Sequence, residues 1–189
     1  MPKSHKKCVF LDLDETIIRS FLLKPDAQFK CKMNFKVIQG YAIVKRPYLD
    51  EFLEEISKHY DVYAYTSATE PYASMIISYI NEAKLLVKGF YSRNECILLN
   101  GIYVKDLRVC GRSLGDVIMI DNSIEAFSLQ TDNGIYIQPF YGENSSDDEL
   151  LSVRNFLLKN ADCCDTRRVI KSTFCLSTLI RFCKNTKEA

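Results

Sequence analysis

Two aspartates separated by one residue follow a short apolar run near the start of the chain. Asp12 and Asp14 come directly after residues 8–11, which we expect to form a buried β-strand. Two carboxylates held this close repel each other, so a cation or a proton must lie between them. One carboxylate can then attack phosphorus while the other transfers the proton of the leaving group. The spacing of Asp12 and Asp14 predicts a catalytic pair in which one carboxylate is the nucleophile and the other the general acid–base.

A second predicted strand, residues 62–65, also ends at polar residues, Thr66 and Ser67. In an open parallel sheet the carboxyl ends of the strands lie at one edge, and ligands bind there. Thr66 and Ser67 should therefore lie near Asp12. Either hydroxyl could donate a hydrogen bond to a phosphoryl oxygen, so we expect a phosphate-binding role for both.

A third strand of this kind, residues 117–120, ends at Asp121 and Asn122. Oxygen atoms of carboxylates and amides are the ligands that a hard cation such as Mg²⁺ prefers. The expected metal site consists of Asp12, Asp14, Asp121 and Asn122. A magnesium ion held there would neutralise charge on the phosphoryl oxygens as the bond breaks.

Lys105 follows a predicted β-hairpin, residues 97–104, whose turn is Asn100-Gly101. Its ammonium group could supply the positive charge that a phosphoryl transition state needs. Each feature alone has a more ordinary explanation, because paired aspartates are commonly a turn or a cap and a lysine is commonly a solvated surface charge. The prediction depends on all of them falling at strand ends, or at a hairpin exit, within one domain.

The predicted elements alternate between strand and helix, which indicates an α/β domain with a mostly parallel sheet and flanking helices. A helix should follow Arg46-Pro47, because proline fits the first helical turn. Residues 29–45 alternate in the manner of β-strands and predict a small antiparallel insertion. We expect one domain over residues 1–170 and a partly helical tail over residues 171–189, which packs on the domain or docks on a partner or membrane surface.

The composition excludes several other classes of protein. The chain has 189 residues, the size of one domain, and 47% of them are apolar. Its formal charge of +1 provides no basic field for direct nucleic-acid binding. We expect no signal peptide and no membrane span. The eight cysteines include no C-x-x-C pair, and there are only two histidines, so free thiols are expected rather than a zinc site or disulfides.

Together the motifs resemble those of one phosphatase family. Residues 7–16 (KCVFLDLDET) are similar to the first motif of the haloacid dehalogenase superfamily. They are more similar still to the small phosphatases that act on the C-terminal domain of RNA polymerase II, a branch that includes NLI-interacting-factor-like and Dullard-like proteins. The resemblance extends over residues 6–170. The other matching motifs, in order, are residues 44–53, 65–68, 103–107 and 120–123.

The resemblance implies a role for each motif residue. Asp12 would form an aspartyl-phosphate, and Asp14 would protonate the leaving oxygen and later activate water. The backbone carbonyl of Asp14 would help to hold Mg²⁺. Thr66 and Lys105 would bind the phosphoryl group, with Arg46 nearby as a further phosphate-binding residue.

The resemblance also implies a Rossmann-like fold in which residues 29–45 replace a large cap domain and leave the site open. An open site suits a phosphorylated protein segment, carrying phosphoserine or phosphothreonine, better than a small metabolite. Residues 21–25 only partly match the segment that shapes the proline-binding pocket of the polymerase-specific members. The polymerase tail and other phosphoproteins therefore both stay open as substrates, and a nuclear rather than cytoplasmic location is implied by the resemblance alone.

A catalytically silent binding module on the same fold is the alternative from another class. Such a module should have lost one of the paired acids, Lys105 or Asp121, and all of these are present. The sequence therefore favours an enzyme.

Overall fold

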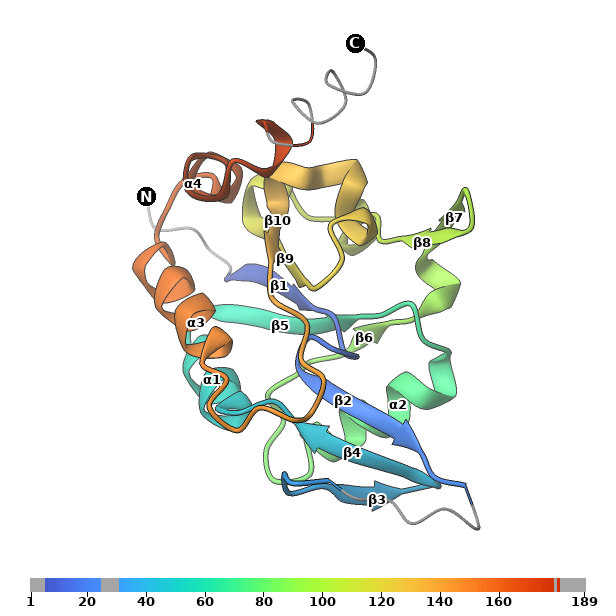
Figure 1. Ribbon diagram of the computed structural model, residues 1–189. Helices are drawn as coiled ribbons and strands as arrows, with labels where there is room; N and C mark the ends of the chain where they lie inside the picture. Colours follow the sequence, from blue (N-terminus) through green and yellow to red (C-terminus); the bar gives the residue numbers. More distant parts are fainter. Residues whose placement is uncertain (1–5, 25–30, 179, 181–189) are drawn as a thin grey trace.

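A five-stranded parallel sheet forms the centre of the computed structural model, which describes residues 6–24, 31–178 and 180 (Figure 1). The strand order is β10-β9-β1-β5-β6, and every neighbouring pair is parallel. This confirms the predicted α/β fold with a mostly parallel sheet. The strands are β1 (Lys7–Leu11), β5 (Tyr60–Tyr65), β6 (Phe90–Tyr91), β9 (Val117–Asp121) and β10 (Gly134–Tyr136).

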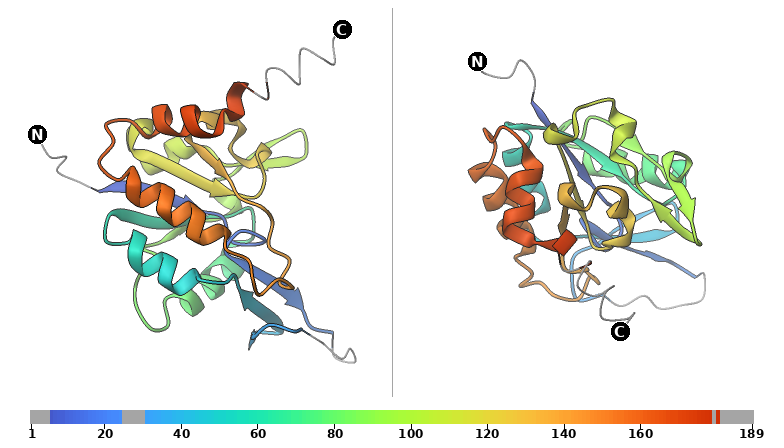
Figure 2. Two further views of the ribbon diagram at one scale, coloured as in Figure 1. Left: turned by 60° about the vertical axis from the view of Figure 1, so that its left-hand side comes forward. Right: turned by 90° about the horizontal axis from the view of Figure 1, so that it is seen from above.

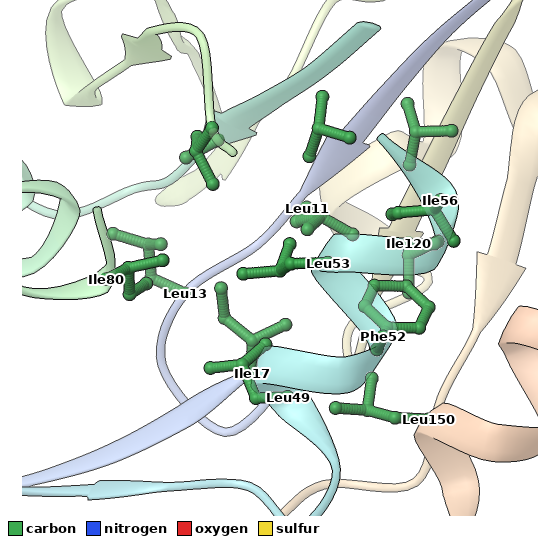
Figure 3. Close-up of a cluster of buried hydrophobic side chains, with 14 of the residues drawn as sticks. Leu11, Leu13, Ile17, Leu49, Phe52, Leu53, Ile56, Ile80, Ile120 and Leu150 are labelled. Carbon is green, nitrogen blue, oxygen red and sulfur yellow. The ribbon is translucent and has the colours of Figure 1, made fainter. Parts of the chain in front are cut away.

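Helices cover both faces of this sheet because its central strands are apolar on both sides. In β1, Val9 and Leu11 face a large core that includes α1, α2 and α3, whereas Cys8 and Phe10 face a smaller core that includes Phe127. Figure 3 shows part of the large core around α1, and Figure 2 shows α1 and α3 side by side. The α-helices are α1 (Leu49–Ile56), α2 (Glu70–Ile80), α3 (Glu149–Lys159) and α4 (Thr166–Phe174). The 3₁₀ segments are η1 (Arg93–Glu95), η2 (Leu107–Cys110), η3 (Leu114–Asp116) and η4 (Glu125–Asn133).

A small antiparallel sheet of three strands, in the order β2-β4-β3, lies beside the main sheet (Figure 1). Its strands β3 (Lys36–Ile38) and β4 (Tyr41–Lys45) fall within the predicted insertion. The third strand, β2 (Ile18–Leu22), lies outside that range and starts four residues after Asp14. The predicted boundary at residue 29 was therefore too late, because β2 has no clear alternation and its partner strand lies about twenty residues further on. Part of the expected insertion, residues 29 and 30, lies outside the described residues.

The predicted hairpin is present as β7 (Ile97–Leu99) and β8 (Ile102–Val104). Asn100 and Gly101 at its turn have φ of 50° and 80°. A two-residue turn with positive φ at both positions matches the twist of a hairpin, and asparagine and glycine tolerate this conformation. The hairpin leads directly to Lys105.

Helix α4 contains the expected domain boundary at residue 170. Ile170 is buried in the large core, and the ring of Phe174 lies 5.1 Å from that of Phe156 in α3. Most of the expected tail, including residues 181–189, lies outside the described residues. Among the residues that the structure describes, no helix is both long enough and apolar enough to cross a membrane.

Candidate active site

The carboxyl ends of β1, β5 and β9 surround one cavity of about 410 Å³. The exit of β8 brings Lys105 to the same place. Every predicted site residue except Arg46 lines this cavity: Asp12, Asp14, Thr66, Ser67, Lys105, Asp121 and Asn122. A larger hollow, of about 500 Å³, lies beside Lys36, Lys45 and Tyr79, but no carboxylate lines it. The side chains that could take part in a reaction therefore gather at the carboxyl edge of the main sheet.

A buried lysine joins the carboxylates of two neighbouring strands. Lys105 Nζ donates to Asp12 Oδ1 at 2.5 Å and to Asp121 Oδ2 at 2.6 Å. All three residues are less than 10% exposed. Burial alone would lower the pKa of Lys105, but the two carboxylates outweigh it and raise that pKa. The lysine therefore stays charged and balances part of the negative charge of Asp12 and Asp121 at the carboxyl ends of β1 and β9.

The loop after β1 directs both Asp12 and Asp14 towards the cavity. The Asp12 N–H donates to the carbonyl of Ile120 at 3.0 Å, which continues the pairing of β1 with β9. The chain then turns, because the N–H groups of Ile17 and Ile18 both donate to the carbonyl of Leu13. Leu13 is fully buried in the large core. The residues on either side of Leu13 face the cavity instead, which explains the D-x-D spacing.

Asp14 accepts hydrogen bonds from two residues that the sequence did not indicate. Its Oδ1 atom accepts from the Tyr72 hydroxyl at 2.5 Å and from the Ser20 hydroxyl at 3.1 Å. Burial raises the pKa of Asp14; the two hydrogen bonds oppose this rise, and the charge of Asp12 adds to it. A carboxyl group with a raised pKa is suited to hold and deliver a proton.

Thr66 and Ser67 contribute to the cavity in different ways. Thr66 is buried, and its N–H donates to the Tyr91 carbonyl at 3.0 Å. Its hydroxyl oxygen accepts from the N–H of Ala68 at 3.1 Å, so its own proton can be donated to a ligand. Ser67 is exposed, and its carbonyl accepts from Arg93 Nε at 2.7 Å.

Arg93 is a cationic lining residue that the sequence analysis did not identify. Its guanidinium lies 4.9 Å from the centre of the Tyr103 ring as well as next to Ser67. Both contacts hold the exposed side chain at the mouth of the cavity. No strand ends at Arg93, which lies in the 3₁₀ segment η1, so the pattern of polar residues after apolar runs did not reveal it.

Arg46, predicted to bind phosphate, does not line the cavity. It is buried, and its guanidinium donates to both carboxylate oxygens of Asp147, at 2.7 and 2.8 Å, and to the carbonyls of Thr16 and Gln138. The Thr16 hydroxyl in turn donates to Asn122 Oδ1 at 3.1 Å. With its donors used in this way, Arg46 fixes the loop below the site instead of binding a ligand.

The donors in the cavity suit a hard cation. In the described part of the chain, no group of three or more His, Cys, Asp or Glu side chains forms a ready metal cage. Mg²⁺ does not need one, because it is commonly bound by one or two carboxylates and keeps several water molecules. The lining carries four carboxylates, including Glu15, but only two cations, Arg93 and Lys105. A phosphate dianion could enter this negative cavity only with additional positive charge, so the lining fits a divalent ion.

The α/β fold of this chain is similar to that of a solved phosphatase structure. A solved structure of the fission yeast RNA polymerase II CTD phosphatase Fcp1 superposes with a TM-score of 0.56. The superposition covers 88% of this chain and 54% of that chain, at 20% sequence identity. At this identity the likeness concerns the fold alone.

The sequence relationship is closer and identifies the family. The model of the family described as NLI interacting factor-like phosphatase matches residues 7–167. CTD small phosphatase-like protein 2 of Dictyostelium discoideum is 36% identical over 95% of this chain and 32% of its own length. CTD nuclear envelope phosphatase 1B of Danio rerio is 34% identical over 78% of this chain and 64% of its own length. The chain belongs to the NLI interacting factor-like phosphatase family, and it spans less than two thirds of the length of these relatives.

Proposed function

We propose that this domain is a magnesium-dependent phosphoprotein phosphatase that acts on phosphoserine or phosphothreonine through an aspartyl-phosphate on Asp12. The observation that carries the proposal is the buried contact of Lys105 with Asp12 and Asp121, with Asp14 lining the same cavity. Family membership supports phosphate ester hydrolysis as the reaction.

In the first step, a carboxylate oxygen of Asp12 attacks phosphorus, and the ester bond to the substrate oxygen breaks. Asp14 gives its proton to that leaving oxygen. In the second step, Asp14 takes a proton from water, whose oxygen attacks the phosphorus of the aspartyl-phosphate. Inorganic phosphate leaves, and Asp12 is regenerated. Lys105 and the Thr66 hydroxyl stabilise the negative charge of the phosphoryl oxygens in both steps.

The carboxylates of Asp12 and Asp121, the side chain of Asn122 and the backbone carbonyl of Asp14 would hold Mg²⁺. When bound, the ion supplies positive charge that neutralises the phosphoryl oxygens and orients the substrate. Asp121 and Asn122 are held ready for this role, because Asp121 Oδ1 accepts from the Ser123 N–H at 2.8 Å and Asn122 contacts the Thr16 hydroxyl.

A phosphorylated protein segment is the substrate that best suits the open cavity. Between β1 and α1, the described residues form only the small antiparallel sheet and no further domain covers the site. The names of the relatives suggest the phosphorylated tail of RNA polymerase II as the substrate, and another phosphoprotein is the alternative. A silent binding module is disfavoured because the acids and the lysine share one cavity. A nuclear location stays a prediction from the family resemblance.

Hydrolysis of p-nitrophenyl phosphate tests this proposal. Turnover should need Mg²⁺, disappear with EDTA, and disappear in the Asp12→Asn variant, which keeps the size of the side chain but removes the nucleophile. No turnover by the folded protein with Mg²⁺ would favour the binding module, and turnover that survives Asp12→Asn would show that another residue is the nucleophile.

A further inference from the structure

The β7–β8 hairpin carries four exposed aliphatic side chains next to the cavity, and its register places Ile97, Leu99 and Ile102 together on one face and Leu98 on the other. Ile97, Leu98, Leu99 and Ile102 are each between 40% and 59% exposed. Figures 1 and 2 show the hairpin standing out from the body of the molecule. Single exposed apolar residues are common on protein surfaces, whereas a contiguous group of them indicates an interaction site.

The fold does not require these side chains to be aliphatic. The turn is determined by the positive φ angles of Asn100 and Gly101, and the buried residue of the hairpin is Val104, which is 3% exposed. Polar side chains at the tip would leave both of these features unchanged. The exposed residues therefore have no evident role in the core, and we call the three that share one face, Ile97, Leu99 and Ile102, the hairpin patch.

The hairpin patch is continuous with the candidate active site. Ile102 and its neighbour Tyr103 line the cavity together with Asp12. Lys105, which contacts Asp12, is the first residue after β8. Since a strand rises about 3.3 Å per residue, Ile102 lies about 10 Å along the chain from Lys105. An extended peptide covers the same distance in about three residues.

The charges on the rim of the cavity favour a bound substrate whose chain extends from the cavity over the β7–β8 hairpin. Arg93, the exposed cation at the mouth, packs on the Tyr103 ring of the hairpin and attracts a phosphorylated chain. The loops after β1 and β9 contribute Glu15, Asn122 and Ser123 to the rim, so a chain leaving over them meets a carboxylate and polar groups.

We propose that the hairpin patch binds aliphatic side chains of the substrate, located two to four residues from the phosphorylated serine or threonine. This inference depends on the proposed function, because it assigns the substrate class of the same site. It makes the hairpin a specificity-determining element: Lys105 binds the phosphoryl group, and the strand that precedes it selects the flanking sequence.

Three synthetic phosphoserine peptides of equal length and charge test the inference. One carries leucines two to four residues before the phosphoserine, one carries them after it, and the third has serine and glutamine at all these positions. Burial of one leucine on the hairpin patch should raise kcat/KM about tenfold or more for one leucine peptide over the polar peptide. In the Ile97→Ser, Leu99→Ser double variant, which changes two residues of the same face, this ratio should fall to about one.

Leu85→Ser is the matched control, because Leu85 is a 75% exposed leucine in the loop before β6, at the amino edge of the parallel sheet and away from Asp12. This variant should keep the wild-type ratio. If wild type hydrolyses all three peptides equally, the inference is wrong while the proposed function stands; if it hydrolyses neither peptides nor p-nitrophenyl phosphate, both are wrong. A wild-type dimer in sedimentation that becomes monomeric in the double variant would assign the hairpin patch to self-association and overturn the inference.

Discussion

Removal of the Tyr72 hydroxyl should slow hydrolysis most for substrates with a poor leaving group. In the structure this hydroxyl donates to Asp14 Oδ1 at 2.5 Å, and Ser20 donates to the same atom at 3.1 Å. Neither Tyr72 nor Ser20 lines the cavity, whereas Asp14 does, so both act on the reaction through Asp14. The Tyr72→Phe variant keeps the aromatic ring and its contact with Tyr41, at 5.4 Å between ring centres. It loses the hydroxyl that contacts Asp14, the proposed general acid, and also Ser20 Oγ at 2.7 Å.

The size of the effect follows from the hydrogen bond that is lost. A hydrogen bond to a charged group contributes about 1.5–3 kcal/mol, which corresponds to a rate factor of about 10 to 150. Because Ser20 still holds Asp14, we expect the lower end, a loss of about tenfold in kcat/KM for a phosphoserine peptide. Serine oxygen leaves poorly without a proton, whereas p-nitrophenolate needs none. The loss for p-nitrophenyl phosphate should therefore stay below about threefold.

The quantity to compare is kcat/KM. In the proposed mechanism it covers the reaction only as far as the aspartyl-phosphate and omits the later activation of water by Asp14. Tyr79→Phe is the control in the same helix, since the Tyr79 ring faces Lys36 and Lys45 and not Asp14. If kcat/KM falls equally for both substrates, Tyr72 maintains the shape of the cavity and does not act through Asp14. If kcat/KM for the phosphoserine peptide does not fall, Asp14 does not need the hydrogen bond from Tyr72.

Three further predictions concern stability. In Gly134→Ala the new Cβ would lie 2.0 Å from a ring atom of buried Phe127, so we expect a loss of about 1–3 kcal/mol, seen as a thermal midpoint lowered by about 2–12 °C. In Asp147→Asn the buried Arg46 charge loses its ionised partner, so the urea midpoint should fall by the equivalent of about 3 kcal/mol, and an unchanged midpoint would refute the role given to Arg46. Burial would raise the pKa of Asp61, but its hydrogen bonds with a lysine and an arginine outweigh burial and lower that pKa. The ionised Asp61 therefore stabilises the folded protein above about pH 4, and this stabilisation is lost as the pH falls through the lowered pKa. Asp61→Asn should therefore destabilise the protein in urea at pH 7 and progressively less towards pH 3.

The sequence predicted the site best where residues close in sequence decide the geometry. A short apolar run that stops at a polar residue identifies a strand end, as at Asp12, Thr66 and Asp121, and parallel strands bring their ends to one edge. The hairpin turn at Asn100-Gly101 was predicted for the same reason, since positive φ at both positions depends on these two residues alone.

Residues positioned by distant partners could not be assigned in this way. Arg46 lies within the matching motif of residues 44–53, and the family resemblance implied that it binds phosphate. Its partner Asp147 lies 101 residues further along the chain and holds Arg46 away from the cavity. Tyr72 lies inside α2 and Ser20 inside β2, where a helical or strand pattern indicates burial and gives no sign of a contact with Asp14. Only the packing of the small sheet against α2 brings them together.

Asp12 and Asp14, the two acids of the proposed mechanism, are therefore supported by different parts of the fold. Asp12 is fixed by the pairing of β1 with β9 in the main sheet and by Lys105 at the exit of the hairpin. Asp14 is held by β2 and α2, and β4 supports this contact because Tyr41 packs on Tyr72. The small sheet thus has a second role besides leaving the cavity open, because it holds Asp14, the proposed proton donor. Substitutions in the small sheet should then act on proton transfer, and those around Lys105 on phosphoryl transfer, although the two acids are separated by a single residue.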